Sequence, residues 1–430
     1  MQGQLSILIA AWLLVMGSSA TPLWAQTLSE AVGKAVQTNP ELLAAQQNKA
    51  AVEQQIGQAR AGYLPTVDVN GGYGREYSNN TTTRATTPDG MTLNRREATV
   101  TATQLLFDGF ATSHAVDKAE QAALAAQHNQ QKTLETVMQS VSDVYLDNYK
   151  QEQLLELVKD NVVLHQRILE KIKQKFESGA GTEADVQQTE TRWALMSSNQ
   201  VAIDTAYKNA VTRFIRVVGE APKGLSLPQV KTALLPKDAN SAVEVALKQH
   251  PAILAAQADL SAAKADYDAT YAAFMPRFNL ELSALNNADV SGTVGDGKGM
   301  AAMLRMNYNL LRGGADLAKQ RESSHRVSAS QEMLDQMQRL VQEGARVAWD
   351  NLEMSRNRIT HLKQHVDISR KVADSYHQQF KMGKRTLLDV LNSETELFTA
   401  RSSLTSEELN YLTNFYRLLG STGQISKAFE

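Results

Sequence analysis

Two long stretches of the chain carry apolar residues at every seventh position. In residues 112–178, which contain neither proline nor glycine, these positions are Leu134, Val141, Leu155, Val162, Leu169 and Phe176, with Asn148 as the one polar exception. In residues 315–382 they are Leu352, Ile359, Val366, Ala373 and Phe380. Sustained heptads predict long helices packed side by side, each about 100 Å long at about 1.5 Å per residue. This pattern alone also fits a soluble helical bundle.

Four shorter segments alternate between apolar and polar residues, which predicts strands at about 66–77, 96–107, 277–286 and 300–311. The clearest is 277–286, where Phe278, Leu280 and Leu282 share one face. Loops rich in Gly, Asn, Thr and Asp join each pair: SNNTTTRATTPDG and NNADVSGTVGDGKG. Such strands fit a membrane β-barrel, and they also fit a soluble sheet with one wet face.

The chain is an internal duplication. VGKAVQTNPELLAAQ at 32–46 matches VEVALKQHPAILAAQ at 243–257, which places Pro40 and Pro251 in register (251 − 40 = 211). Further on, FESGAGTEADVQQTET from Phe176 matches FKMGKRTLLDVLNSET from Phe380 (380 − 176 = 204). We therefore divide the chain into a first repeat at 26–219, a connector at 220–240 and a second repeat at 241–430, each predicted as helix, β-hairpin, long helix, tight turn and helix. The predicted fold class is mainly α with a β-barrel segment.

Residues 1–25 predict an export signal peptide, because an apolar run from Leu5 to Met16 precedes a small, polar stretch. We expect cleavage after Ala25, with Ala20 as the alternative site; the alternative to a signal is a buried helix of a cytosolic protein. No other apolar run reaches the roughly 18–20 residues that a spanning helix needs. The chain has no Cys, hence no disulfide and no thiol for a lipid anchor.

Membrane insertion of this chain would require a β-barrel, and four strands cannot close one, since the smallest known have about eight. Several copies must then pool their strands. A trimer would give 4 × 3 = 12 strands, and the sequence alone leaves a dimer with eight open.

Charge and local motifs give no sign of catalysis. Lys plus Arg total 44 against 46 for Asp plus Glu, so the balance does not favour nucleic-acid binding. The segment GTVGDGKG at 292–299 nearly matches a phosphate-binding loop, but Gly299 stands where Ser or Thr is needed. His361 and His365 have metal-ligand spacing without the Glu of a zinc protease, and a solvated helix face explains them better. We expect no enzyme activity, no cofactor and no metal.

Several motifs together resemble those of the TolC family of outer-membrane efflux and secretion proteins. They are the duplication, LSEAVGKAVQTNPEL, GYLPTVDV, LLFDG and the two turns, of which the second is the most specific, with Gly383, Arg385, Thr386, Asp389 and Val390. The resemblance implies a homotrimer with a 12-stranded barrel in the outer-membrane lipid, continuing into an α-helical tunnel across the periplasm. It also implies docking with a periplasmic adaptor protein and an inner-membrane ABC exporter or proton-driven pump.

The two turns are the candidate adaptor-docking tip, formed by Gly179, Ala180, Gly181, Gly383 and Lys384. Glycines suit the end of a helix and a reversal of direction, and a threonine after each turn can cap the next helix. At the far end of helices about 100 Å long, these turns would lie well away from the membrane.

The candidate periplasmic aperture comprises Asp185, Arg385, Asp389 and Asn392. In the family, acidic residues matching Asp389 and the position of Asn392 form rings, so the Asn makes a second acidic ring doubtful here. Our hypothesis is that three Asp389 carboxylates converge, favour cations and have raised pKa values through like-charge proximity, while Arg385 helps to hold the tip closed. The alternative is an acid favoured by a helix N-terminus.

We expect a passive exit duct whose energy comes from an inner-membrane partner. Type I protein secretion is favoured over multidrug efflux, because the lipid-anchor Cys is absent and the chain is more similar overall to secretion members. A rival of another class is a periplasmic coiled-coil adaptor or scaffold, which needs no membrane strands.

Overall fold

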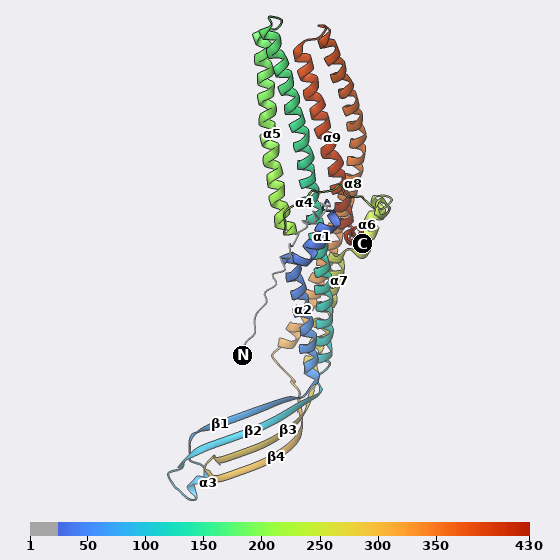
Figure 1. Cartoon of the computed structure of the whole chain (residues 1–430). Helices are drawn as coiled ribbons and strands as arrows, with labels where there is room; N and C mark the ends of the chain where they lie inside the picture. The colour runs from blue at the N-terminus through green and yellow to red at the C-terminus, as the bar shows by residue number, and fades with distance from the viewer. Residues whose placement is uncertain (1–24) are drawn as a thin grey trace, which may run out of the picture.

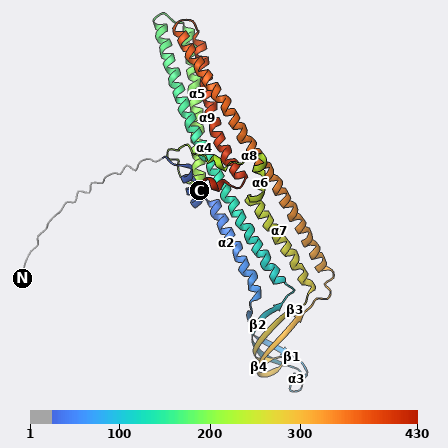
Figure 2. The same cartoon turned by 90° about the vertical axis from the view of Figure 1, so that its right-hand side faces the viewer.

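A computed structural model describes residues 25–430, so the predicted signal peptide lies outside the described residues except for Ala25. The molecule is elongated, with a sheet at one end and two helical hairpins at the other (Figure 1). A view turned by 90° shows the same division (Figure 2).

The chain order is helices, β-hairpin, long helix, turn and helix, followed by the same series again, as the duplication predicts. In the first half the elements are α1 (Leu28–Thr38), α2 (Pro40–Arg60), η1 (Ala61–Tyr63), β1 (Thr66–Ser78), α3 (Thr81–Arg84), β2 (Met91–Phe107), α4 (Ala111–Glu177) and α5 (Glu183–Val218). In the second they are η2 (Thr232–Leu234), α6 (Ala239–Gln249), α7 (Pro251–Ala269), η3 (Thr270–Phe274), β3 (Arg277–Val290), β4 (Thr293–Asn307), α8 (Ala315–Lys381), α9 (Leu387–Ser421) and η4 (Ile425–Ala428).

The long helices α4 and α8 each contain 67 residues. Each begins after a residue in the left-handed region, Phe110 before α4 and Gly314 before α8, so the chain turns sharply as it leaves the sheet. None of the helices described within residues 25–430 is both long and apolar enough to cross a membrane.

The four strands form one antiparallel sheet in the order β1-β2-β3-β4. A single row across it pairs Val69 with Val100, Val100 with Ala284, and Ala284 with Met300. The strand register therefore brings the alternating apolar residues of both repeats onto one face, as residues two apart in a strand share a face.

The strand bounds differ from the sequence expectation at the hairpin ends. β4 begins at Thr293 rather than near 300 and stops at Asn307 rather than 311, and β2 begins at Met91 rather than 96. The segment expected to be a long second loop is mostly strand, closed by a tight turn in which Asp289 and Ser291 adopt positive φ angles. The glycines of this segment lack the side-chain pattern of a strand, yet their backbone groups still pair.

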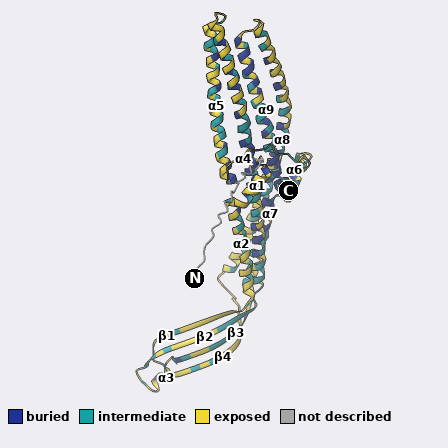
Figure 3. Cartoon of the chain, viewed as in Figure 1, coloured by how far each residue is buried: buried dark blue, intermediate teal, exposed yellow. Residues whose placement is uncertain are grey.

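The main hydrophobic core lies at the middle of the molecule, where the two hairpins meet the connector (Figure 3). Tyr145 of α4, Phe214 of α5 and Phe415 of α9 are fully buried there. The Tyr145 hydroxyl lies 2.7 Å from the carbonyl oxygens of both Gln26 and Ser226. The start of the first repeat and the connector are thereby fixed against the same helix.

Candidate functional site

The two helical hairpins end in turns of the same construction, far from the sheet (Figure 1). Gly179 and Gly383 follow the two long helices with φ angles of +77° and +70°. The next residues, Ala180 and Lys384, each donate their N–H to a carbonyl five residues earlier at 2.9 Å. This is the Schellman type of helix end, in which glycine avoids the strain that a Cβ would create.

Gly181 does not have the role expected for it. Its backbone is outside the left-handed region, and the matching position of the second turn holds Arg385 (385 − 181 = 204). Only one glycine per turn therefore carries the reversal. A Cβ at Gly181 would lie 3.1 Å from the backbone nitrogen of Phe176. Glycine at this position therefore avoids a close contact and is not needed for the backbone conformation.

Each turn is followed by a capping box that fixes a candidate acid. The Oγ1 atoms of Thr182 and Thr386 accept the N–H groups of Asp185 and Asp389 at 3.2 Å and 3.3 Å. In return the Thr hydroxyls donate to the Asp Oδ2 atoms at 2.7 Å and 2.9 Å. Each carboxylate also accepts the backbone N–H of its Thr at 3.3 Å, so the hydroxyl and the carboxylate together satisfy free N–H groups at the start of α5 and α9.

The pKa of Asp389 is lowered from its ordinary value in the single chain, first by the hydrogen bond from the Thr386 side chain and further by the charge of Arg385. This direction is opposite to the one expected for a ring of acids, because the local donors stabilise the carboxylate. The convergence of three such groups stays a prediction.

Arg385 lies against its own hairpin. Its Nη1 atom is 3.7 Å from Asp389 Oδ2, its Nε donates to Gln379 Oε1 at 3.0 Å, and its guanidinium carbon lies 4.3 Å from the centroid of the Tyr376 ring. Arg385 therefore lies beside Asp389 of α9, and its contacts with Gln379 and Tyr376 tie the turn to α8. Its part in holding the tip closed stays a prediction.

Asn392 contacts the other hairpin, which sequence reasoning missed. Its Oδ1 accepts from Arg192 Nη2 at 3.0 Å, linking α9 to α5. Below it, the apolar side chains of Ile172, Leu387 and Leu391 form a small buried cluster between the hairpins. The two hairpins of one chain consequently pack against each other through helix residues near their turns.

A polar groove of about 740 Å³ lies over α4, α5, α8 and α9 near the middle of the molecule. Its charged walls are paired across helices: Arg213 with Asp147 at 2.5 Å, Arg417 with Asp143 at 3.4 Å, and Arg358 with Glu407 at 3.2 Å. Burial raises the pKa of Asp143, although Arg417 opposes this. Sequence inspection could not find this groove, because its lining comes from helices more than 200 residues apart.

The two motifs set aside in the sequence have ordinary structural roles. His365 Nε2 lies 2.8 Å from Glu396 Oε1 of the neighbouring helix α9. The segment 292–299 completes the β3–β4 hairpin. No cluster of three or more His, Cys, Asp or Glu that could hold a metal ion occurs in residues 25–430.

The sheet has one apolar and one polar face. The apolar face exposes, among others, Val67, Val69, Met300, Leu304 and Met306. On the polar face, Arg305 pairs with Glu281 across β3 and β4.

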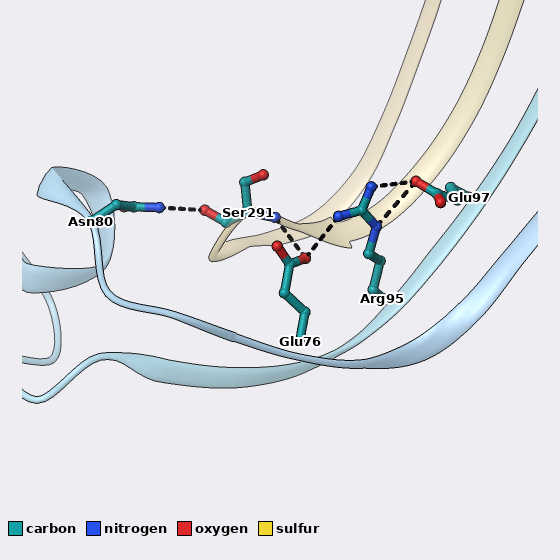
Figure 4. Close-up of polar contacts among 5 residues, drawn as sticks. All are labelled: Glu76, Asn80, Arg95, Glu97 and Ser291. Atoms are coloured by element: carbon teal, nitrogen blue, oxygen red, sulfur yellow. Dashed lines mark hydrogen bonds and ion pairs between the residues drawn. The ribbon is translucent and has the colours of Figure 1, made fainter.

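At the end of the sheet away from the helices, polar contacts join the two β-hairpins (Figure 4). Glu76 accepts from the Ser291 N–H at 3.1 Å and from Arg95 Nη1 at 3.4 Å, and Arg95 also pairs with Glu97 at 2.5 Å. Asn80 Nδ2 donates to the Ser291 carbonyl at 2.8 Å. The β1–β2 loop is thus fastened to the β3–β4 turn.

Comparison with known proteins accounts for this architecture. A family model described as "Outer membrane efflux protein" matches residues 31–220 and 242–424. The chain belongs to this family. The two matched segments correspond to the two repeats, and the unmatched residues between them lie mostly in the connector.

Relatives and solved structures extend the likeness over nearly the whole chain. It is 27% identical to the outer membrane efflux protein BepC of Brucella suis, covering 97% of this chain and 90% of BepC. It is 24% identical to the alkaline protease secretion protein AprF of Pseudomonas aeruginosa, covering 98% and 89%. The structure of the outer membrane protein VceC from Vibrio cholerae superposes with a TM-score of 0.80 at 16% identity, covering 94% of this chain and 97% of VceC.

Membership of this family makes the chain an efflux protein of the outer membrane. The family's proteins transport substrates and are not enzymes. The elements described above are those of a conduit: a sheet with one apolar face, long helices and a packed helical tip.

Proposed function

We propose that this chain is the exit duct of a tripartite type I protein secretion system. Three copies form a passive conduit, which receives protein from an inner-membrane ABC exporter through a periplasmic adaptor. The observation that carries the proposal is the incomplete state of one chain: its sheet and its second long helix both present surfaces that further copies would complete.

The sheet supports the sharing of strands. Among residues 25–430, β1 and β4 pair with a strand on one side only, and their other edges carry backbone N–H and C=O groups without a strand partner. Such edges recruit further strands, and in lipid they must be paired. Three copies would supply 4 × 3 = 12 strands, with the apolar face of each sheet toward the outer-membrane lipid.

The helices support assembly with further copies through the internal repeat. α4 packs against α5 and α9 in one half of the molecule and against α2 and α7 in the other. Its equivalent α8 packs against α9 and α7, but within residues 25–430 it makes no comparable contact with α5 or α2. If the repeats are equivalent, α8 receives α5 and α2 of another copy.

An exposed apolar stripe on α8 marks this missing contact. Its members recur every seven residues, with one polar interruption at His361: Met333, Leu340, Val347, Met354 and Ile368. A heptad stripe left in solvent on a long helix favours the docking of another helix. In the proposed trimer it is buried between copies.

The tip is the proposed docking surface for the adaptor. Gly179, Ala180, Gly383 and Lys384 are exposed, and Gly181 is half-buried. Small residues and turn backbone at this end leave room for close approach of a partner's helices. Replacing Ala180 and Lys384 with bulkier acidic residues should reduce adaptor co-purification without loss of the oligomer.

Three copies of Asp389 form the proposed aperture, with Asp185, Arg385 and Asn392 beside them. A ring of carboxylates favours cations, and the lowered pKa of Asp389 in the single chain keeps it ionised at neutral pH. Single-channel recording of Asp389→Ala tests this ring. Cation preference should fall, and an unchanged preference would refute it.

Protein cargo is favoured by the likeness to AprF, whose name describes protease secretion. The likeness to BepC, described as an efflux protein, favours multidrug efflux as the second candidate. Deletion of the gene separates the two. Loss of a secreted protein from the medium with unchanged drug sensitivity supports type I secretion, whereas unchanged secretion with increased drug sensitivity supports efflux.

A further inference from the structure

The internal repeat places one ion pair at the same position in both hairpins. Lys173 of α4 lies 2.7 Å from Glu190 of α5, and His377 of α8 lies 2.6 Å from Glu394 of α9. Both members are related by the register of the turns (377 − 173 = 204 and 394 − 190 = 204). The acid is the same in both repeats, and only the cationic partner differs.

The two pairs differ in burial as well. The side chains of Lys173 and Glu190 are 44% and 47% exposed, whereas those of His377 and Glu394 are 32% and 10% exposed. Glu394 also lines a cavity of about 120 Å³ between α4 and α9. A buried carboxylate depends strongly on its counter-ion, because removing one partner leaves an unpaired buried charge.

His377 is the one side chain within ion-pair distance of Glu394 in the described part of the chain. The other charged groups near the pair come from three helices: Asp160 of α4 and Arg401 of α9, which line the same cavity, and Asp374 and Lys381, which lie about one turn from His377 on α8. His165 of α4, buried one turn beyond Asn161 of that cavity, is the remaining titratable group on this side.

Protonation distinguishes the two pairs chemically. A lysine stays charged throughout the neutral range, since its ordinary pKa is about 10.4, whereas an imidazole near about 6.5 gains or loses its charge there. The two pairs therefore differ in the kind of cation they contain, a lysine in the first and an imidazole in the second.

We propose that the His377–Glu394 pair is a proton-sensitive ion pair that stabilises the tip of the α8–α9 hairpin in acid and releases it as the pH rises. The α4–α5 hairpin, held by Lys173 and Glu190, keeps its stability across the same range. One hairpin of each chain thus responds to periplasmic pH while the other serves as a fixed frame. The consequence for passage through the tip rests on the proposed duct function; the difference between the hairpins does not.

A second histidine–glutamate contact is also found only in the α8–α9 hairpin of the described residues. His365 pairs with Glu396 at 2.8 Å, again between α8 and α9. The matching positions of the first repeat are Asn161 and Arg192, which cannot form such a pair. Because His365 and Glu396 are largely exposed, their contribution should be smaller.

Hydrogen exchange of the purified full-length oligomer can test this inference. Backbone amide exchange would be followed by mass spectrometry at about pH 5.5 and about pH 8, which bracket the ordinary imidazole range. The segments 370–395 and 166–191 report on the two hairpins in the same sample, so their ratio cancels the intrinsic pH dependence of exchange. The wild type should show about a fivefold greater loss of protection in 370–395 on raising the pH.

Variants taken from the repeat itself provide matched controls. His377→Lys gives the second hairpin the partner of the first, and should abolish the pH-dependent difference. Lys173→His should give 166–191 only a small pH response, because the pair with Glu190 is exposed. Glu394→Gln, which keeps the side-chain size, should remove the response and lower protection at acidic pH. His365→Lys should change the response by less than twofold, because that pair is exposed.

The outcomes separate the inference from the duct proposal. An unchanged pH response in both His377→Lys and Glu394→Gln overturns the inference, whatever the conductance. A failure of the purified protein to conduct ions in a bilayer contradicts the duct alone. If the inference and the duct proposal are both correct, single-channel conductance should rise with pH in the wild type and rise less in His377→Lys.

Discussion

The middle of the molecule and its sheet use apolar residues in opposite ways. At the middle, Tyr145, Phe214 and Phe415 are fully buried by contacts that one chain supplies. In the sheet, Val69 is 73% and Met300 is 91% exposed although both lie on the apolar face. The helical core is therefore complete within a chain, whereas the sheet needs lipid and further copies. Stability therefore depends on the middle of the molecule, and assembly depends on the sheet.

The largest effect should come from opening the core. Phe214→Ala removes a fully buried ring, which typically costs about 3–5 kcal/mol. Denaturant unfolding followed by the helical circular dichroism signal would measure it. Tyr73→Ala is the control, because this ring is 80% exposed on the sheet. It should change the free energy of unfolding by less than about 0.5 kcal/mol. Equal effects at both sites would contradict the division.

A charge on the apolar face of the sheet should impair assembly rather than helical stability. Leu304→Arg places a cation toward lipid, at about 2–4 kcal/mol if it lies near the bilayer midplane. Met303→Arg, one residue earlier, faces the polar side beside Glu281 and should be tolerated. The yield of folded oligomer in liposomes measures both. Tolerance of Leu304→Arg would mean that this face does not meet lipid.

A buried acid near the core should give a distinct pH dependence. Burial raises the pKa of Glu135 to about 7, opposed by the charge of Lys427. The proton then binds more tightly in the folded state, so its contribution is complete below the ordinary value and is lost as pH rises through about 7. Glu135→Gln should thus be more stable than the wild type at alkaline pH, by at most about 3 kcal/mol per chain, with little difference in acid. Parallel stability–pH curves would disprove the shift.

The smallest expected effects distinguish two glycines of the second long hairpin. Gly383→Ala forces a Cβ into a φ of +70° and should destabilise the tip by about 1 kcal/mol. Gly344→Ala, inside α8 with nothing within 4 Å of the new Cβ, should stabilise by about 0.5–1 kcal/mol. Thermal unfolding of both variants checks the opposite signs. A shift in the same direction would mean that the turn tolerates alanine.

The parts that sequence predicted well depend on local rules. Heptads, alternation and the Thr–Asp capping boxes act within a few residues, so the long helices, the strand faces and the glycine of each turn could be read directly. The internal duplication also predicted that the same order of elements occurs in both halves of the chain. The start of β4 was missed, because its glycine-rich strand pairs through backbone groups and lacks a side-chain pattern.

Contacts between distant segments could not be predicted in this way. The link from Arg192 to Asn392 and the charged groove joining Asp143 to Arg417 depend on how the two hairpins pack. The sequence predicted Thr386 as a helix cap, but its hydrogen bond to the Asp389 carboxylate, which lowers the pKa in the single chain, is seen only in the structure. The pairing of His377 with Glu394 also depends on how α8 packs against α9, which the sequence alone does not give.

Native mass spectrometry of the detergent-solubilised mature protein tests the central claim most directly, because it counts the copies that complete the sheet and the α8 stripe. The account predicts a species of three chains that persists until detergent or heat disrupts it. A monomer that is stable and soluble without detergent would contradict it, since the exposed faces of β4 and α8 would then need no partner.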